Sequence, residues 1–383
     1  MSKSIKKIIA LVLAALLLTL CCLGCGSEPA PTEAPTEAPA AAPTEAPTEA
    51  PTEAPTEAPT EAPTEAPTEA PTEAPTEPPV AYRHPLTGEP LDAPITSRVF
   101  AFSINNQIPA LPHVGTQQAD ILFEMYVNGY LTRCLALYTD ISSVESIGSI
   151  RSMRYNFTDI CQAYDAFMVH ASGSKEVLAD MRNSGVDNIW AIDGPNISYR
   201  DKWRLNNGYD YEHTLMMNGP VLYDFLVSDG RRVTTNEENK TYGLNFTEDG
   251  TPADGEDASV INITFRIKKE ASKLSTMTYD QEMGRYVYTQ YGRNNPKDDP
   301  ENFENVFVMF AEVKNKGQYH VANLSGEGEG YYACNGKIIP IKWYHETDTA
   351  PFVFTHVDGT PLEQGVGNSY IAIVPLESDV EWE

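Results

Sequence analysis

Residues 167–185 read Phe-Met-Val-His-Ala-Ser-Gly-Ser-Lys-Glu-Val-Leu-Ala-Asp-Met-Arg-Asn-Ser-Gly, and this stretch decides the fold class of the first half of the chain. Its mostly apolar start, 167–170, predicts a short β-strand. Ser174 is placed to cap a helix that runs through Arg182, and Gly185 is placed to end it. A strand that leads into a helix is the repeating unit of α/β domains, so we expect such a domain here.

The same alternation of strand and helix extends in both directions. A helix is predicted over 157–165, and Asn218-Gly-Pro220 opens another over 221–228, because proline is tolerated in a first helical turn. We therefore assign residues 81–230 to an N-terminal α/β domain. Its upstream strands, rich in β-branched and aromatic residues, are predicted at 99–104, 121–126 and 134–139.

The pattern changes after residues 231–258, a polar stretch that we interpret as a linker or insert. Over 260–267 apolar and polar residues alternate, which predicts a strand with one buried face. Asn335-Gly336 lies between two strand-like runs and is a strong hairpin signal. We expect residues 259–383 to form a mostly antiparallel β domain. Its further strands are predicted at 286–291, 306–313, 319–324, 352–355 and 370–374.

The N-terminus has the features of a targeting segment. Three lysines precede a 13-residue apolar run at 8–20, and Leu23-Gly-Cys25 follows. This run is shorter than the ~20 residues that a membrane span needs, so it favours a secretory signal peptide. Its ending resembles a bacterial lipobox, which predicts a signal peptide over 1–24 and a lipid on Cys25. The alternatives are an uncleaved anchor or cleavage at Cys21 or Cys22.

A Pro-Thr-Glu-Ala repeat fills residues 31–77 and carries 11 glutamates. Proline at nearly every fourth position excludes a helix, so we expect a disordered acidic linker over 25–80. Of the chain's 54 acidic and 27 basic residues, 12 and three precede Val80, which leaves the rest with a net charge of −18. Such an acidic body argues against nucleic acid as a partner. No long apolar run after residue 24 predicts a polytopic membrane protein.

The densest polar run is Gly148-Ser-Ile-Arg151-Ser152-Met-Arg154. Two arginines and two serines at the entry to a helix could hold a carboxylate or a phosphate. The alternative is that these arginines pair with the many surface acids. With nearby basic and hydroxyl groups, they make up the predicted ligand-binding set: Arg133, Arg151, Ser152, Arg154, His170, Ser172, Ser174 and Arg200.

A hydrolase interpretation starts from the carboxyl end of the strand at 167–170. Ligands bind at such ends in open α/β sheets, and a serine nucleophile with a histidine base could act there. The Gly-x-Ser-x-Gly motif is absent, however, and a capping Ser174 beside a structural His170 is the simpler interpretation. Paired carboxylates could instead act on a glycan. The catalytic candidates are therefore His170, Ser172, Glu124 and Asp201.

Other residue classes carry weaker signals. The seven histidines show no metal-ligand spacing, and we expect neither a metal nor a cofactor. Cys134, Cys161 and Cys334 are predicted to lie in the core without a disulfide framework. The tyrosines of the second half and Trp343 could form a face for stacking sugars, although such residues more often pack within a sheet.

Short motifs along residues 84–375 together resemble a known family. They include His84-Pro-Leu-Thr-Gly-Glu, Gln118-Ala-Asp-Ile-Leu-Phe-Glu124, Ile147-Gly-Ser-Ile-Arg-Ser-Met-Arg154 and Tyr370-Ile-Ala-Ile-Val-Pro375. In this order they are similar to the YerB-like lipoproteins of Gram-positive bacteria. The resemblance implies a two-part domain at the cell surface and no assigned reaction. The chain departs from that pattern near 205–215, so His213 is not carried over as an equivalent position.

These observations predict a lipid-anchored protein on the extracytoplasmic face of the cell membrane. Its expected function is to bind an anionic or sugar-containing ligand of the cell envelope. One alternative is an envelope hydrolase or transferase that acts on glycan or peptide. Another is a module that docks other proteins at the cell surface. The expected partners are the membrane, through the lipid, and a cell-wall component or a surface protein.

Overall fold

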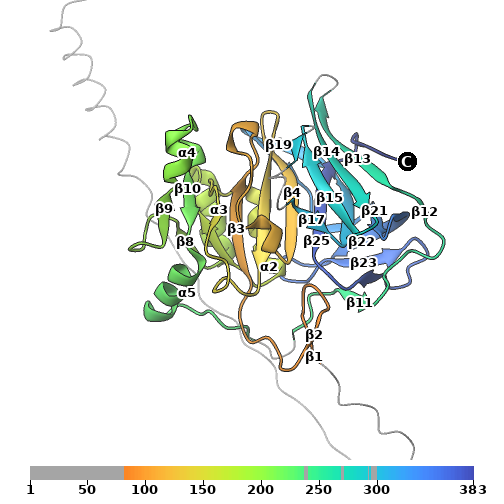
Figure 1. Ribbon diagram of the computed structural model, residues 1–383, viewed down its shortest axis with the longest axis horizontal. Helices are drawn as coiled ribbons and strands as arrows, with labels where there is room; N and C mark the ends of the chain where they lie inside the picture. The colour runs from red at the N-terminus through yellow and green to blue at the C-terminus, as the bar shows by residue number, and fades with distance from the viewer. Residues whose placement is uncertain (1–81, 237–239, 269–270, 292, 295–299) are drawn as a thin grey trace, which may run out of the picture. The chain divides into compact units, whose positions relative to one another are not determined.

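The computed structural model describes residues 82–383 apart from 237–239, 269–270, 292 and 295–299 (Figure 1). The predicted signal peptide over 1–24, the lipid site Cys25 and the repeat linker lie outside the described residues. Within the described residues, no helix is both long enough and apolar enough to cross a membrane.

The described chain is mostly β-structure with a few short helices. The first half contains β1 (Tyr82–Arg83), β2 (Pro90–Leu91), β3 (Phe100–Asn105), β4 (Ile121–Asn128), β5 (Leu131–Tyr138), β6 (Ile147–Gly148), α2 (Tyr155–Ala163), β7 (Phe167–His170), α3 (Lys175–Ser184), β8 (Asn188–Trp190), β9 (Ser198–Arg200), α4 (Lys202–Asn206), β10 (Leu215–Met217) and α5 (Gly219–Ser228). Three 3₁₀ turns, Ile108–Ala110, Thr116–Gln118 and Tyr211–His213, join them.

The second half is built from strands. They are β11 (Asn245–Thr247), β12 (Glu256–Asp257), β13 (Val260–Lys268), β14 (Ala271–Asp280), β15 (Arg285–Gln290), β16 (Arg293–Asn294), β17 (Asn302–Phe303), β18 (Asn305–Ala311), β19 (Val313–Lys316), β20 (Tyr319–Ala322), β21 (Gly326–Cys334), β22 (Lys337–His345), β23 (Val353–His356), β24 (Glu363–Gly365), β25 (Ser369–Pro375) and β26 (Asp379–Trp382).

The strand-to-helix unit over 167–185 is confirmed. Ser174 accepts a hydrogen bond on its side chain from Val177 N, and α3 follows directly. Gly185 ends the helix with φ 75°, a left-handed conformation that glycine adopts without steric cost. The Asn335-Gly336 hairpin is confirmed as well, because both residues have positive φ between β21 and β22.

One sheet of 13 strands runs through both halves of the chain. Its main path is β12-β22-β21-β18-β25-β4-β5-β3-β7-β8. The halves meet where β4 pairs in parallel with β25, with Ile121 opposite Ser369. Strands on either side of the polar stretch 231–258 thus belong to one sheet.

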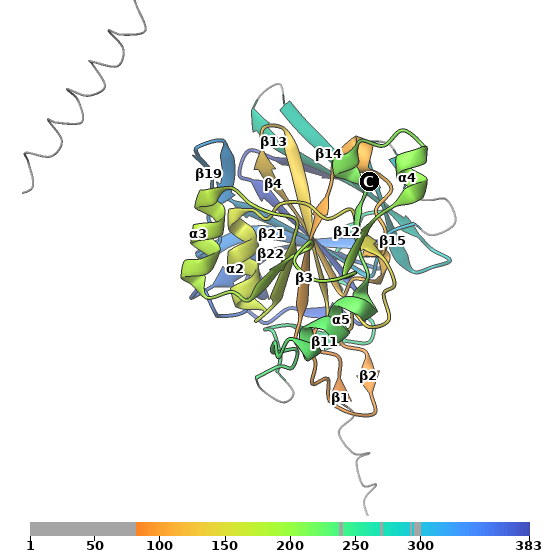
Figure 2. The same cartoon turned by 90° about the vertical axis from the view of Figure 1, so that its left-hand side faces the viewer.

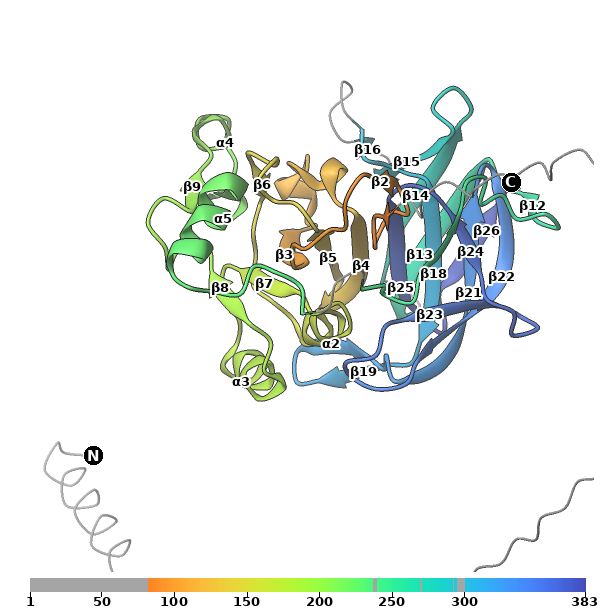
Figure 3. The ribbon, with the colours of Figure 1, turned by 90° about the horizontal axis from the view of Figure 1, so that it is seen from below.

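Side chains alternate across this sheet and bury two apolar clusters. Phe123 faces the cluster that α2 and α3 cover, while Leu122 faces the cluster that includes α5 residues such as Leu222. Figure 2 shows α2 and α3 on one side of the central strands and α5 on the other. Figure 3 separates this helical half from the β-rich half. There a second sheet, β16-β15-β14-β13-β26, packs through Ile261 and Met277 into the same cluster as α5.

Candidate functional site

The polar run 149–154 lies beside the carboxyl ends of β3 and β7, which are parallel neighbours. Arg151 N donates to Ser103 O at 2.8 Å, and Ala171 N donates to Arg151 O at 2.9 Å. The Ser152 and Ser172 hydroxyl oxygens lie 2.8 Å apart. The run therefore brings two predicted ligand-binding segments together at the expected edge of the sheet.

Arg133, Arg151 and Arg154 form a cluster here, which we call the arginine cluster. Arg133, on β5, is only 3% exposed and donates from Nη1 to the carbonyl oxygen of Ser152. Arg154, at the N-cap of α2, donates from Nη1 to Met153 O at 2.8 Å and lies over the ring of Tyr319. The backbone thus holds two guanidinium groups in place without neutralising them.

The arginine cluster has more positive charge than its surroundings balance. Arg151 Nη1 lies 3.3 Å from Glu212 Oε2. Among the described residues, no carboxylate lies within ion-pair distance of Arg133 or Arg154. Burial, then Arg154 and Arg151, lower the pKa of Arg133 well below its ordinary value. Like charges held together in a dry site favour the binding of an anion.

Several polar atoms at this edge are buried without a hydrogen-bond partner. They include the Nε atoms of all three clustered arginines, Ser149 Oγ and Asn106 Oδ1. Folded proteins leave few buried polar groups unpaired, and each such group calls for an explanation. A bound anion would supply the acceptors that the three Nε donors lack.

Other predicted ligand-binding residues have separate partners. Ser174 caps α3. Arg200, on β9, donates to Tyr211 O at 2.7 Å and stacks at 3.8 Å over the Tyr211 ring. The structure therefore brings together Arg133, Arg151, Ser152, Arg154 and Ser172, while Ser174 and Arg200 have structural contacts of their own.

The catalytic candidates do not converge. His170 is fully buried, with Nδ1 3.0 Å from Ser172 O and Nε2 3.2 Å from Asn188 Oδ1, and burial lowers its pKa. The Ser172 hydroxyl contacts Ser152 rather than a base. Asp201 caps α4 by accepting from the backbone N–H groups of Trp203 and Arg204. Among the described residues, the Ser172 hydroxyl therefore has no base in hydrogen-bond contact.

Glu124 lies in the interior, away from the arginine cluster. Its carboxylate is 0% exposed and 2.6 Å from Lys273 Nζ, itself 1% exposed. Five further donors complete its shell: the side chains of Asn106, Thr132, Ser275, Tyr288 and Tyr370. No feature of the sequence pointed to Lys273, because β14 is too polar to be predicted as a strand.

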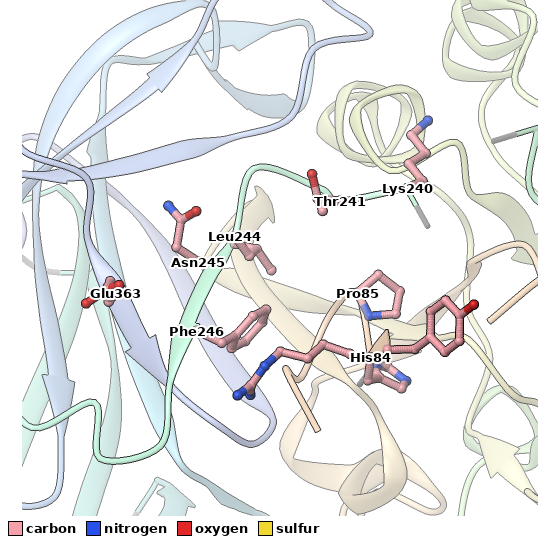
Figure 4. Close-up of a pocket in the computed structure, with 10 residues that line it drawn as sticks. His84, Pro85, Lys240, Thr241, Leu244, Asn245, Phe246 and Glu363 are labelled. Atoms are coloured by element: carbon pink, nitrogen blue, oxygen red, sulfur yellow. The ribbon is translucent and has the colours of Figure 1, made fainter. Parts of the chain in front are cut away.

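A separate hollow of about 680 Å³ opens beside β1 and β11 (Figure 4). Phe246 and Leu244 lie on one side of it and Pro85 on the other. Arg83 lines the hollow and forms an ion pair with Glu248, with Nη2 3.0 Å from Oε1. None of the predicted site residues lines this hollow, so we do not assign the site to it.

His84 lines the same hollow and starts a chain of hydrogen bonds. Its Nδ1 accepts from the backbone N–H groups of Leu86 and Thr87, so the proton of the neutral ring is on Nε2. Nε2 donates to Thr139 Oγ1 at 2.8 Å, which donates to Asp120 Oδ2 at 3.0 Å. Burial lowers the pKa of His84 to about 4 and raises that of Asp120 to about 7.

We predict that Asp120→Asn removes a pH-dependent loss of stability. The pKa of Asp120 is raised in the folded state. The contribution of Asp120 to folding stability is therefore fully present below about pH 4 and is lost as the pH rises through 7. At about 1.4 kcal/mol per pKa unit, the loss reaches up to about 4 kcal/mol. Urea denaturation at pH 5, 6, 7 and 8 measures the free energy of unfolding. As the pH rises, this free energy should increase in the variant relative to the wild type. Parallel curves for the two proteins would contradict this prediction.

Some of the predicted aromatic residues line another hollow, of about 510 Å³. Tyr331 and Trp343, of which Trp343 is only 1% exposed, border it together with Phe310, Glu327 and Glu329, which were not predicted. Other members of the predicted sugar-stacking face, Tyr286, Tyr288 and Tyr332, are buried in the core. The three described cysteines are also buried and unpaired, as expected. Across the described part of the chain, no three His, Cys, Asp or Glu side chains gather as metal ligands would.

Comparison with known proteins finds relatives over both halves. Residues 86–231 match the family model "Protein of unknown function (DUF3048) N-terminal domain", and residues 261–371 match the corresponding C-terminal domain. "Putative lipoprotein YerB" of Bacillus subtilis is 23% identical over 299 residues, which cover 76% of this chain and 86% of that protein. A crystal structure of YerB from Bacillus subtilis has a TM-score of 0.65 at 21% identity and covers 78% of this chain and 99% of that one. These matches confirm the family resemblance of the sequence motifs and a shared fold.

Proposed function

The chain belongs to the DUF3048 family, and on that premise we propose that it is an extracytoplasmic lipoprotein that binds an anionic ligand of the cell envelope at the arginine cluster. The observation that carries this proposal is the pair of buried or half-buried arginines, Arg133 and Arg154, for which no described carboxylate is a partner. Charged donors that lack acceptors are costly to bury, and an anion would offset that cost.

The lipid anchor in this proposal rests on the Leu23-Gly-Cys25 ending and on the name of the Bacillus subtilis relative. Each buried methylene of an acyl chain contributes ~0.8 kcal/mol to membrane binding, so several chains on Cys25 would hold the protein stably. The acidic repeat linker would then separate the folded part of the chain from the membrane. Proline-rich linkers are extended, and this extension would set the distance that the linker spans.

A sugar-containing ligand has its own, smaller support in the hollow beside the half-buried Tyr331, since Trp343, which also borders this hollow, is only 1% exposed. Aromatic rings with nearby carboxylates are a common setting for sugar hydroxyls. The enzyme alternative gains less support, because His170, Ser172, Glu124 and Asp201 each have structural partners elsewhere. A protein-docking role has no specific observation in its favour.

Replacing Arg151 and Arg154 together by glutamine should weaken binding of the full-length chain to purified cell-wall fragments by about 100-fold. This expected change corresponds to the loss of one charged hydrogen bond from each arginine, at ~1.5 kcal/mol for each bond. Isothermal titration calorimetry measures the change. Arg266→Gln is the control for loss of an arginine elsewhere, because it removes one positive charge from an exposed pair with Asp379 on the second sheet. Equal binding by the double variant and the wild type would rule out this site.

A further inference from the structure

The arginine cluster has the charge and the free donors of a site for a tetrahedral dianion. We propose that its ligand presents a doubly charged phosphate group, as in a phosphomonoester or a diphosphate, rather than a carboxylate. This inference rests on the proposed function, since it specifies the chemistry of the anion that the same site binds.

Several hydrogen-bond donors of the arginine cluster lack acceptors. Arg133, Arg151 and Arg154 each bury an Nε–H that has no partner. Nη2 of Arg133 also makes no hydrogen bond with the described residues. In the Ser152–Ser172 pair, one hydroxyl proton lies between the two oxygens, which leaves the other free to donate. The site therefore has about five donors without an acceptor among the described residues, of which the three Nε–H groups are buried from solvent.

A phosphate matches that count better than a carboxylate does. A carboxylate has two acceptor oxygens, with roughly four acceptor positions, which is fewer than the number of donors. A phosphate group presents three strong acceptor oxygens, one more than a carboxylate. The first turn of α2 adds to the attraction, because its N-cap residue, Arg154, makes no side-chain capping bond. Tetrahedral anions are the usual ligands where arginines meet an open helix N-terminus.

The net charge of the arginine cluster also favours a dianion. The cluster carries three guanidinium groups, and of these only Arg151 lies within ion-pair distance of a described carboxylate, that of Glu212, which also lies 3.7 Å from His213 Nε2. Two positive charges are left unbalanced among the described residues, which is the charge that a dianion neutralises. Arg151 keeps 22% of its side chain exposed, so a ligand can reach the cluster from solvent while Arg133 forms its buried base.

The test compares three small probes on the full-length chain by isothermal titration calorimetry. At pH 7.5, sulfate and methyl phosphate should bind at least about 10-fold more tightly than acetate, because each uses more of the free donors. Arg154→Gln should lower sulfate affinity by about tenfold, the equivalent of ~1.4 kcal/mol, and Ser172→Ala by less. Arg266→Gln should leave it unchanged. These variants avoid the buried Arg133, whose replacement can prevent folding.

Lowering the pH to 5.0 tests the requirement for two charges. Methyl phosphate loses its second charge near pH 6, so its affinity should fall by about tenfold, while sulfate keeps both charges and should bind as before. The titratable groups that face the cluster are Glu212, His213, Tyr319 and His170. Any contribution from them changes sulfate binding as well and is thereby measured.

The outcomes separate this inference from the proposed function. Acetate that binds as tightly as sulfate, or methyl phosphate affinity that is constant with pH, would overturn the dianion site while arginine-dependent binding of wall fragments stands. Sulfate binding that is unchanged in Arg154→Gln would also overturn it. Wall-fragment binding that survives the double Arg151 and Arg154 substitution would instead overturn the proposed function.

Discussion

Lys273→Met is expected to destabilise the protein by about 3–5 kcal/mol, the cost of leaving a buried charge without its partner. Lys273 Nζ lies 2.6 Å from Glu124, and both side chains are fully enclosed between the two sheets. Burial alone would raise the pKa of Glu124, but Lys273 and the surrounding hydrogen bonds lower it below its ordinary value. Urea denaturation at pH 7.5 measures the loss of unfolding free energy.

The pH dependence identifies the cause of that loss. In the wild type, the depressed pKa of Glu124 adds stability that is present above its unfolded value and is lost as the pH falls. Without Lys273, burial would raise this pKa, so the variant should recover part of its deficit as the pH falls toward 5. A deficit that is constant from pH 7.5 to 5 would show that lost packing, and not the unpaired carboxylate, is responsible.

The double variant Lys273→Met with Glu124→Gln is the matched control. A neutral amide can still accept and donate within the shell of Ser275, Tyr288 and Tyr370. We expect it to recover most of the stability, because replacing both members of a buried pair is far less costly than removing one. A double variant as unstable as Lys273→Met would contradict this account.

Local signals in the sequence predicted the parts of the fold that depend on local chemistry. The cap at Ser174, the glycine stop at Gly185 and the Asn335-Gly336 hairpin each follow from backbone preferences within a few residues. The basic run at Arg151 and Arg154 was visible for the same reason, as an exception in an acidic chain. The sequence placed Ser172 at the carboxyl end of a strand, but it left open whether the basic run lies close to it.

The parts that sequence could not predict depend on contacts between distant segments. The β4–β25 pairing that joins the halves has no local signature, since apolar alternation marks a strand but does not name its neighbour. Sequence alone makes Glu124 a catalytic candidate, because an acidic residue gives no sign in the sequence that its side chain is buried. Its lysine lies on β14, where serines and threonines obscured the strand pattern.

Arg204→Met is the second variant for which we expect a large effect, a loss of about 3 kcal/mol or more. Arg204 is 1% exposed and donates from Nη1 to Ala110 O at 2.7 Å and to His213 O at 3.0 Å, and from Nη2 to Pro112 O. Methionine would fill much of the space but donate nothing. Each buried carbonyl left without a donor costs ~1–3 kcal/mol, and water can reach only some of them.

This loss should be local as well as global, because Arg204 ties the turn at Ile108–Ala110 to the turn at Tyr211–His213. Hydrogen exchange in Arg204→Met should rise first at these two turns, which would open below the global unfolding free energy. Glu212 lies in the second turn, so its release from Arg151 would also leave the arginine cluster more positive. Arg231→Met, at an exposed arginine whose one ion pair among the described residues is with Asp229, should change stability by less than about 0.5 kcal/mol. Equal effects of the two substitutions would show that the buried hydrogen bonds of Arg204 do not hold the turns.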